Sequence, residues 1–158
     1  MLSVWRIGST KGLNLRSLHI GSTLESGRWH RTPADGGLPV VYTGSSRALC
    51  QLEKRVHCNG VQPINQALMR LDLPDGASLL DIAALETVPA NWRDDESWSQ
   101  DAGIRWRASS ASLGLWVPSA VEPGESNLIL NPDHPTFGAI VVAVERNPFQ
   151  FDRRMFNP

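Results

Sequence analysis

The chain has 158 residues, of which 41% are hydrophobic and 20% are charged, and its formal net charge is -1. This composition is typical of one soluble globular domain, here residues 1–158, and the charge balance excludes a global field that attracts nucleic acid or an anionic membrane. No apolar run approaches the ~20 residues of a membrane helix, and no secretory signal is visible, so we expect a cytoplasmic protein that does not contact membranes.

The two cysteines, Cys50 and Cys58, agree with a reducing compartment. Eight residues along one helix correspond to roughly 12 Å of axial rise, which is too far for a disulfide. A cytoplasmic location is therefore the simpler expectation.

Alternating and helical patterns divide the chain into short elements. The polar residues 8–26 and the tryptophan-rich residues 86–101 are expected to be loops, the second with a helical turn, before a helix over 102–111. Because strands outnumber helices and do not alternate with them, the pattern predicts an α+β fold. The expected strands, of which 67–73 has a half-exposed pattern, cover residues 2–7, 38–43, 67–73, 79–82, 113–118, 126–131 and 138–144.

A helix is expected to follow Ser45 or Ser46, either of which can cap it. Glu53 lies at the border of its apolar stripe and is expected to be partly buried, whereas Lys54 points the opposite way and is expected in solvent. A glutamate that reaches water is the other interpretation, because charged side chains are rarely buried without a partner. The apolar residues at helical spacing are Ala48, Leu49, Leu52 and Val56.

The polar residues lack the spacing of several known kinds of site. The four histidines share no metal-ligand spacing with each other or with the cysteines, so no metal site is predicted. No glycine-rich phosphate loop follows a strand, and the Gly-x-Ser-x-Gly elbow of serine hydrolases is absent. Basic residues are not interleaved with the six tryptophans, so direct nucleic-acid binding is not expected.

Three residues, Arg28, Tyr42 and Glu53, occur in this order beside strand or helix signals. A nucleotide with a cleavable glycosidic bond needs a cation for its phosphates, a ring for its base and a carboxylate beside its ribose. Ser119 ends a buried strand beside a proline, where a hydroxyl often ties down a turn. Arg6 lies on an apolar face of the first strand and needs an anion, either an internal carboxylate or a ligand phosphate.

At these residues the chain resembles the RES family, which is named for its arginine, glutamate and serine. The resemblance maps these three onto Arg28, Glu53 and Ser119, and it maps the active-site tyrosine of the family onto Tyr42. His30 departs from the family, which more often has asparagine there. The matching motifs follow in order along almost the whole chain: Trp5-Arg6-Ile7, Gly27-Arg28-Trp29, Val41-Tyr42-Thr43, the helix with Glu53, Pro118-Ser119-Ala120, Asn127-Leu128-Ile129-Leu130-Asn131-Pro132 and His134-Pro135.

The resemblance implies an ADP-ribosyltransferase-like fold, with a mixed or antiparallel sheet and flanking helices. It implies a bacterial toxin of a type II toxin–antitoxin pair that destroys NAD by hydrolysis or phosphorolysis of the nicotinamide–ribose bond, with NAD as substrate and no cofactor. The implied partner is an Xre-like helix-turn-helix antitoxin that plugs the active site, and a homodimer within the complex is also expected.

Site residues follow from the same resemblance and from the chemistry of the side chains. The expected catalytic residues are Glu53, Arg28, Tyr42 and Ser119. NAD is expected to contact Arg6, Arg28, Tyr42 and Asn127. The position of Ser119 leaves open whether its hydroxyl contacts the carboxamide, the ribose or Glu53.

Three other functions stay open at this point. The same site could transfer ADP-ribose to a host protein, because water, phosphate and a side chain all attack the same carbon. A non-catalytic module that binds NAD is the alternative of another class. An RNA-cleaving toxin has little support, because no cluster of acids, bases and cations is apparent.

Overall fold

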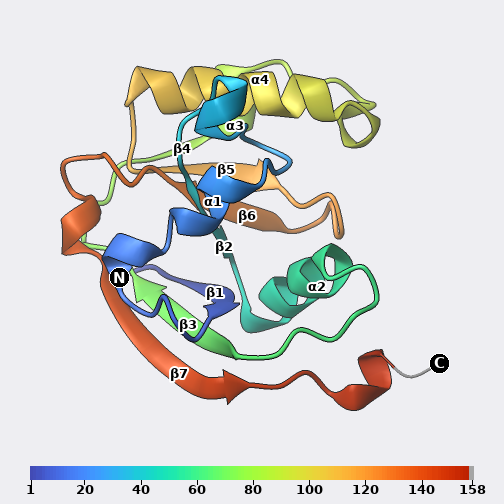
Figure 1. Cartoon of the computed structure of the whole chain (residues 1–158). Helices are drawn as coiled ribbons and strands as arrows, with labels where there is room; N and C mark the ends of the chain where they lie inside the picture. The colour runs from blue at the N-terminus through green and yellow to red at the C-terminus, as the bar shows by residue number, and fades with distance from the viewer. Residues whose placement is uncertain (157–158) are drawn as a thin grey trace.

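One seven-stranded mixed sheet organises the computed structural model, which describes residues 1–156 (Figure 1). The strand order is β4-β5-β6-β2-β1-β3-β7. Only the β4–β5 pair is parallel, and the other pairs described are antiparallel. The predicted α+β class is therefore confirmed. The strands are β1 (Ser3–Ser9), β2 (Val41–Gly44), β3 (Gln66–Asp72), β4 (Leu79–Asp81), β5 (Gly114–Pro118), β6 (Ser126–Leu130) and β7 (Val141–Phe149).

The longer helices begin at side chains that cap them. Ser46 accepts a hydrogen bond from Leu49 N (3.0 Å), as predicted, and Asp95 accepts one from Trp98 N (3.0 Å). The Asp95 cap starts its helix six residues before the predicted residue 102. The α-helices are α1 (Ile20–Leu24), α2 (Arg47–His57), α3 (Ile82–Leu85) and α4 (Glu96–Ser109), and the 3₁₀ turns are η1 (Leu15–Ser17), η2 (Pro33–Asp35), η3 (Trp92–Asp94), η4 (Phe137–Ala139) and η5 (Arg153–Met155).

Several expected segments differ from the structure in their boundaries, among them the strand expected over 38–43, which begins only at Val41. Residues 8–26 are not one loop, because β1 continues to Ser9 and η1 and α1 follow. The predicted strand 138–144 begins later, since η4 occupies its first residues, and β7 then runs to Phe149. Within the described part of the chain, no helix has the length and apolar character needed to cross a bilayer.

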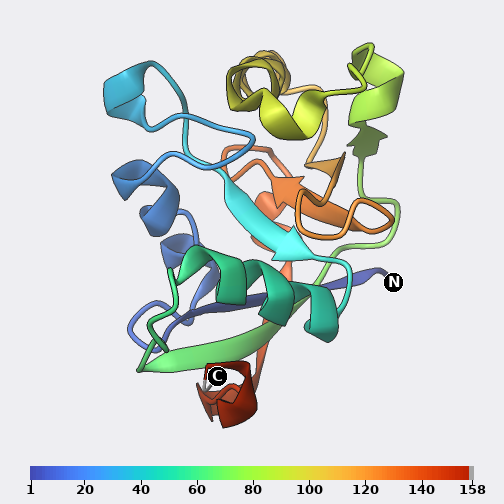
Figure 2. The same ribbon diagram turned by 90° about the vertical axis from the view of Figure 1, so that its right-hand side faces the viewer.

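The sheet divides where β1 meets β2. Strand β1 pairs with β3 from Ser3↔Asp72 to Ser9↔Gln66, but its pairing with β2 is the single register pair Trp5↔Gly44. Helix α2 packs against both β1 and β2 at this junction, while α3 and α4 lie at the other end of the molecule, over the half that contains β5 (Figures 1 and 2). The junction thus brings α2 close to the ends of strands from both halves.

Strand β3 is buried on both faces, so the predicted half-exposed pattern is wrong. Leu68 packs with Cys50 and Phe149 on one side, whereas Met69 and Leu71 belong to the cluster on the other side. The alternation did not reveal this, because β3 lies between β1 and β7 and side chains cover both of its faces. Its fully buried residues, each 0% exposed, are Ala67, Leu68, Met69 and Leu71.

The buried face of α2 also differs from the expected stripe. Leu49 and Cys50 are buried, but Leu52 and Val56 are 42% and 55% exposed. Since α2 packs into the junction of two strands, the face it buries is rotated away from Leu52 and towards Glu53.

Lys54 is partly buried rather than solvated, which corrects the second expectation for this helix. Burial lowers the pKa of its ammonium group, and the positive charge of Arg6 lowers it further. The rotation of α2 therefore places Lys54 in the electrostatic range of the first strand.

Candidate active site

Glu53 is held by side chains from two other elements. Its Oε1 accepts hydrogen bonds from Ser119 Oγ (2.6 Å) and from Asn127 Nδ2 (2.7 Å). Ser119 follows β5, Asn127 lies on β6 and Glu53 lies on α2, so the contact exists only in the folded chain. The Glu53 side chain is 22% exposed, which confirms the expected partial burial. Its Oε2 lies 4.0 Å from Nε2 of the exposed His57.

Ser119 has both of the roles that its position suggested. Its buried hydroxyl accepts hydrogen bonds from Val121 N (3.1 Å) and Glu122 N (3.0 Å), so it ties down the turn after β5. The same hydroxyl donates its proton to Glu53. Of the three contacts left open for the Ser119 hydroxyl, with the carboxamide, the ribose or Glu53, the structure therefore shows the one with Glu53.

Asn127 presents its amide nitrogen to Glu53, and this contact fixes which way the amide points. Its Oδ1 is buried and has no donor among residues 1–156. Asn127, which is expected to contact NAD, therefore also contacts the Glu53 carboxylate directly.

The hydroxyl of Tyr42 lies at the centre of a second hydrogen-bonded cluster, which includes Trp29 and His30. Trp29 N donates to it over 3.1 Å, and Nδ1 of His30 lies 2.7 Å away. Burial raises the pKa of the Tyr42 phenol well above its usual range, and the hydrogen bond from Trp29 opposes this rise. The charges of Arg28 and Glu53 also act on this pKa, in opposite directions. Tyr42 thus lies within the electrostatic range of both predicted charged residues.

Arg28 directly precedes Trp29, whose N–H contacts the Tyr42 hydroxyl. Helix α4 makes hydrogen bonds to the backbone of this segment. Arg28 donates from Nη1 to Arg93 O (2.8 Å), and its guanidinium lies 6.0 Å from the ring centroid of Trp92. Its carbonyl oxygen accepts a hydrogen bond from Ser99 Oγ (2.6 Å). Gln100 Nε2 donates to the preceding carbonyl, of Gly27, over 2.9 Å.

Gly103 lets α4 approach the same segment closely. A Cβ atom at this position would lie 1.8 Å from Trp29 O, so only a hydrogen fits there. The contacts that α4 makes through Ser99 and Gln100 were not predicted, because the expected helix began only at residue 102. A sequence signal did exist in the small residues Ser99 and Gly103, which stand four apart on one helical face.

Arg6 directs its guanidinium group towards strand β2. Its Nη1 donates to Tyr42 O (3.0 Å), and among residues 1–156 no carboxylate lies within ion-pair distance of it. Burial lowers the pKa of this guanidinium, and Cys50 partly opposes the change. Arg6 was expected to face either an internal carboxylate or a ligand phosphate. The described part of the chain, residues 1–156, provides no such carboxylate.

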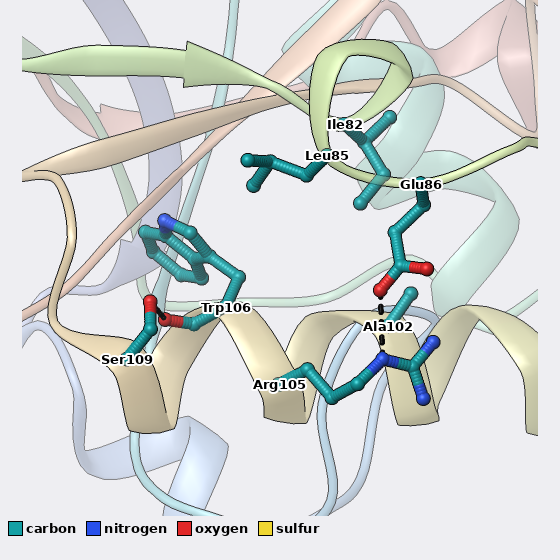
Figure 3. A pocket seen from close by; sticks show the side chains of 7 residues that line it. All are labelled: Ile82, Leu85, Glu86, Ala102, Arg105, Trp106 and Ser109. Carbon is teal, nitrogen blue, oxygen red and sulfur yellow. Dashed lines mark hydrogen bonds and ion pairs between the residues drawn. The ribbon is translucent and has the colours of Figure 1, made fainter.

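A hollow elsewhere in the molecule contains none of these side chains. It lies between α3 and α4, has a volume of ≈ 180 Å³ and is bordered by an ion pair between Arg105 and Glu86 (2.7 Å; Figure 3). The α3–α4 pocket is lined by Ile82, Leu85, Glu86, Ala102, Arg105, Trp106 and Ser109. Across residues 1–156 no group of three or more histidine, cysteine, aspartate or glutamate side chains could hold a metal ion, and both cysteines are free thiols.

Comparisons with known proteins show which family this chain resembles. The RES domain model matches residues 3–152. A protein from Photorhabdus laumondii named Toxin Res is 35% identical over 138 residues, which cover 85% of this chain and 85% of the relative. A protein from Sphingobium sp. (strain YBL2) named Prs ADP-ribosylating toxin is 34% identical over 139 residues, which cover 85% of this chain and 83% of the relative.

A solved structure supports the fold. The crystal structure of the M. tuberculosis MbcT–MbcA toxin–antitoxin complex contains a chain that superposes with a TM-score of 0.63 at 15% identity, over 98% of this chain and 86% of that one. The α+β fold is therefore shared with this structure. Together with the match over residues 3–152, these relatives show that the chain belongs to the RES domain family.

Proposed function

We propose that this protein is the toxin of a toxin–antitoxin pair and that it cleaves the bond between nicotinamide and ribose in NAD. The observation that carries the proposal is the Glu53 carboxylate, which Ser119 and Asn127 hold through one oxygen only. Its second oxygen, 4.0 Å from His57 Nε2, is free of both donors. A fixed carboxylate with one available oxygen is what a developing sugar cation requires.

The chemistry explains why one carboxylate suffices. The nicotinamide–ribose bond breaks through an oxocarbenium-like state, as in glycoside cleavage. Nicotinamide leaves as a neutral molecule from a cationic one, so no general acid is needed and the positive charge moves onto the ribose. Glu53 stabilises that charge, an effect worth ~10²–10³ in rate when such a contact is removed.

The remaining residues orient the substrate. Arg28, together with Arg6, binds the diphosphate, because guanidinium groups make bidentate contacts to phosphate oxygens. The ring of Tyr42 packs against the cationic nicotinamide, a contact worth about 0.5–2 kcal/mol. Holding both ends of NAD keeps the reacting carbon beside Glu53, and such orientation contributes several kcal/mol to catalysis.

The second candidate function is ADP-ribosylation of a protein. It is favoured by the Sphingobium relative, whose name describes it as an ADP-ribosylating toxin and which is 34% identical to this chain. The first bond to break is the same in both reactions, and only the acceptor differs: water, phosphate or a protein side chain.

The proposed partner is an Xre-like helix-turn-helix antitoxin that covers the active site in the cytoplasm, in a complex that contains a homodimer of the toxin. The structural neighbour was crystallised as a toxin–antitoxin complex, which supports a partner of this class. The site would need such a partner, since free enzyme would deplete the NAD of its own host.

The test is to incubate purified protein with NAD, inorganic phosphate and a bacterial cell extract, so that water, phosphate and protein acceptors are all available, and to identify the products by mass spectrometry. We expect nicotinamide together with ADP-ribose or ADP-ribose 1″-phosphate, and intact NAD with the Glu53→Gln variant. Nicotinamide together with a modified protein would favour the second candidate. Thermal stabilisation by NAD without nicotinamide release would instead identify a non-catalytic binding module and contradict the proposal.

A further inference from the structure

Three groups from different parts of the chain converge on the imidazole of His30, which is 3% exposed. The Tyr42 hydroxyl lies 2.7 Å from Nδ1, and Gly27 N lies 3.2 Å from the same nitrogen. On the other side of the ring, Ser22 O lies 2.9 Å from Nε2. His30 therefore connects helix α1, the segment that carries Arg28, and strand β2.

These partners determine where the imidazole proton lies. A backbone N–H such as that of Gly27 only donates, so Nδ1 is an acceptor. A carbonyl such as that of Ser22 only accepts, so Nε2 carries the proton. The Tyr42 hydroxyl must then donate its own proton to Nδ1, while it accepts the N–H of Trp29.

The surrounding packing keeps the ring in this neutral form. A second proton on Nδ1 would face the N–H of Gly27, and burial lowers the pKa of His30 although the carbonyl groups of Ser22 and Glu25 oppose the change. A Cβ atom on Gly27 would lie 2.7 Å from the Tyr42 hydroxyl oxygen and 3.1 Å from His30 Nδ1. The backbone beside Arg28 therefore packs directly on the His30–Tyr42 pair.

We propose that His30 is a positioning residue, whose Nδ1 accepts a hydrogen bond from the Tyr42 hydroxyl and so fixes the Tyr42 ring and the Gly27–Arg28 backbone relative to each other. The proposal rests on the proposed function, because it assigns the ring to the nicotinamide and Arg28 to the diphosphate. This hydrogen bond also limits the chemistry of Tyr42. Because the phenolic proton is donated to His30 Nδ1, Tyr42 acts on the substrate through its ring and not as a proton donor.

The simpler role for His30 is to fill the core and satisfy Ser22 O. That role predicts that substitutions of His30 and of Tyr42 act independently on catalysis. A positioning role predicts that they do not, because both substitutions remove the same hydrogen bond, and effects of residues in contact are not additive.

The kinetic test compares four variants in NAD consumption. His30→Leu removes the acceptor at similar volume, Tyr42→Phe removes the donor, and His30→Asn keeps an oxygen acceptor near the position of Nδ1. We expect kcat/KM to fall about tenfold in His30→Leu and about tenfold in Tyr42→Phe. The double variant should show the same tenfold loss as each single variant. In His30→Asn, kcat/KM should stay near the wild-type value. His134→Ala is the matched control, because among residues 1–156 the imidazole of this histidine hydrogen-bonds only to Thr136 in its own turn.

A loss of about a hundredfold in the double variant, or wild-type activity in His30→Leu, would overturn the proposal. A measurement on the wild-type protein covers the case in which His30→Leu does not fold. Nitrogen-15 NMR of the imidazole should show an unprotonated, hydrogen-bonded Nδ1 and a protonated Nε2, and a proton on Nδ1 would overturn the assignment.

The tyrosine provides a readout that does not depend on NAD. Tyr42 is the single tyrosine of the chain, so the alkaline change in phenol absorbance reports it alone. We expect this titration to stay near its wild-type position in His30→Asn and to shift to lower pH in His30→Leu, because donation to Nδ1 stabilises the neutral phenol. If wild-type protein leaves NAD intact, the proposed function fails, while the NMR and absorbance results still decide whether His30 holds Tyr42.

Discussion

The two charged ends of the candidate site are held in different ways. Side chains from the sheet hold Glu53 at one end, since Ser119 follows β5 and Asn127 lies on β6. Arg28 at the other end lies in a loop, whose backbone is fastened by Ser99 of α4 and by the neighbouring contacts of His30. The sheet thus fixes the position of the carboxylate that we propose to act on the ribose, while loop packing fixes the position of the guanidinium that we propose to bind the diphosphate. Substitutions at the two ends should therefore affect turnover and stability to different extents.

The largest effect is expected at the reacting end. Glu53→Gln keeps an oxygen that accepts from Ser119 and Asn127 but removes the charge, so kcat should fall by ~10²–10³, or roughly 3–4 kcal/mol. NAD binding and melting temperature should stay close to those of the wild type. Steady-state kinetics with calorimetric measurement of NAD affinity checks both statements, and turnover at the wild-type rate would show that Glu53 is not the reacting carboxylate.

The anchoring end should respond to Gly103→Ala. The added Cβ would lie 1.8 Å from Trp29 O, so the backbone beside Arg28 must move, and we expect a loss of roughly 3 kcal/mol in the free energy of unfolding together with weaker NAD binding. Gly138→Ala is the matched control, because nothing lies within 4 Å of a Cβ at that position. Urea denaturation of both variants makes the comparison, and equal stability would contradict the close approach of α4.

Ser119→Ala should produce a smaller change that combines both kinds of effect. It leaves Val121 N and Glu122 N without their acceptor and Glu53 without one donor, so the unfolding free energy should fall by roughly 1–2 kcal/mol. kcat should fall as well, by about tenfold. Asn127→Ala, which loses only the contact to Glu53, is the comparison. If Ser119→Ala lost stability while kcat stayed at the wild-type value, the hydroxyl would serve the turn alone.

The smallest expected effect is a dependence of stability on pH at the anchoring end. The pKa of His30 is lowered in the folded chain, so the unfolded chain binds this proton first as the pH falls below the ordinary value of 6.5. The contribution of His30 to stability is therefore complete above that pH and decreases as the pH falls towards the folded pKa. The difference in unfolding free energy between wild type and His30→Asn, measured across this range, should shrink on acidification. A difference that grew would mean that the imidazole is charged in the folded protein.

Many of the elements that carry the candidate site could be predicted, because their signals are local. The cap at Ser46 and the strand that leads to Ser119 are written in neighbouring residues, and the RES motifs identified Arg28, Tyr42 and Glu53 as a set. The motifs did not reveal which residue each of these side chains contacts. The contact between Glu53 and Ser119 spans 66 positions of the chain, and no periodic pattern encodes such a distance.

The errors have physical causes of the same kind. Leu52 is apolar and stands at the right spacing, but it is exposed because the junction of β1 and β2 receives a different face of α2. His30 was noted only as a departure from the family, although its two nitrogens connect three segments. The spacing of Ser99 and Gly103 was visible in the sequence, but it did not reveal what Gly103 contacts, because that partner is a carbonyl group more than seventy positions away, in Trp29.

The most direct test of the central claim is a crystal structure of Glu53→Gln captured after a short soak with NAD, because this variant should bind the substrate and consume it ~10²–10³ times more slowly than the wild type. We predict that the anomeric carbon of the nicotinamide ribose lies against the side chain at position 53, with the diphosphate on Arg28 and Arg6 and the nicotinamide on the ring of Tyr42. NAD bound elsewhere, for example in the α3–α4 pocket, or bound with its ribose remote from position 53, would contradict the account.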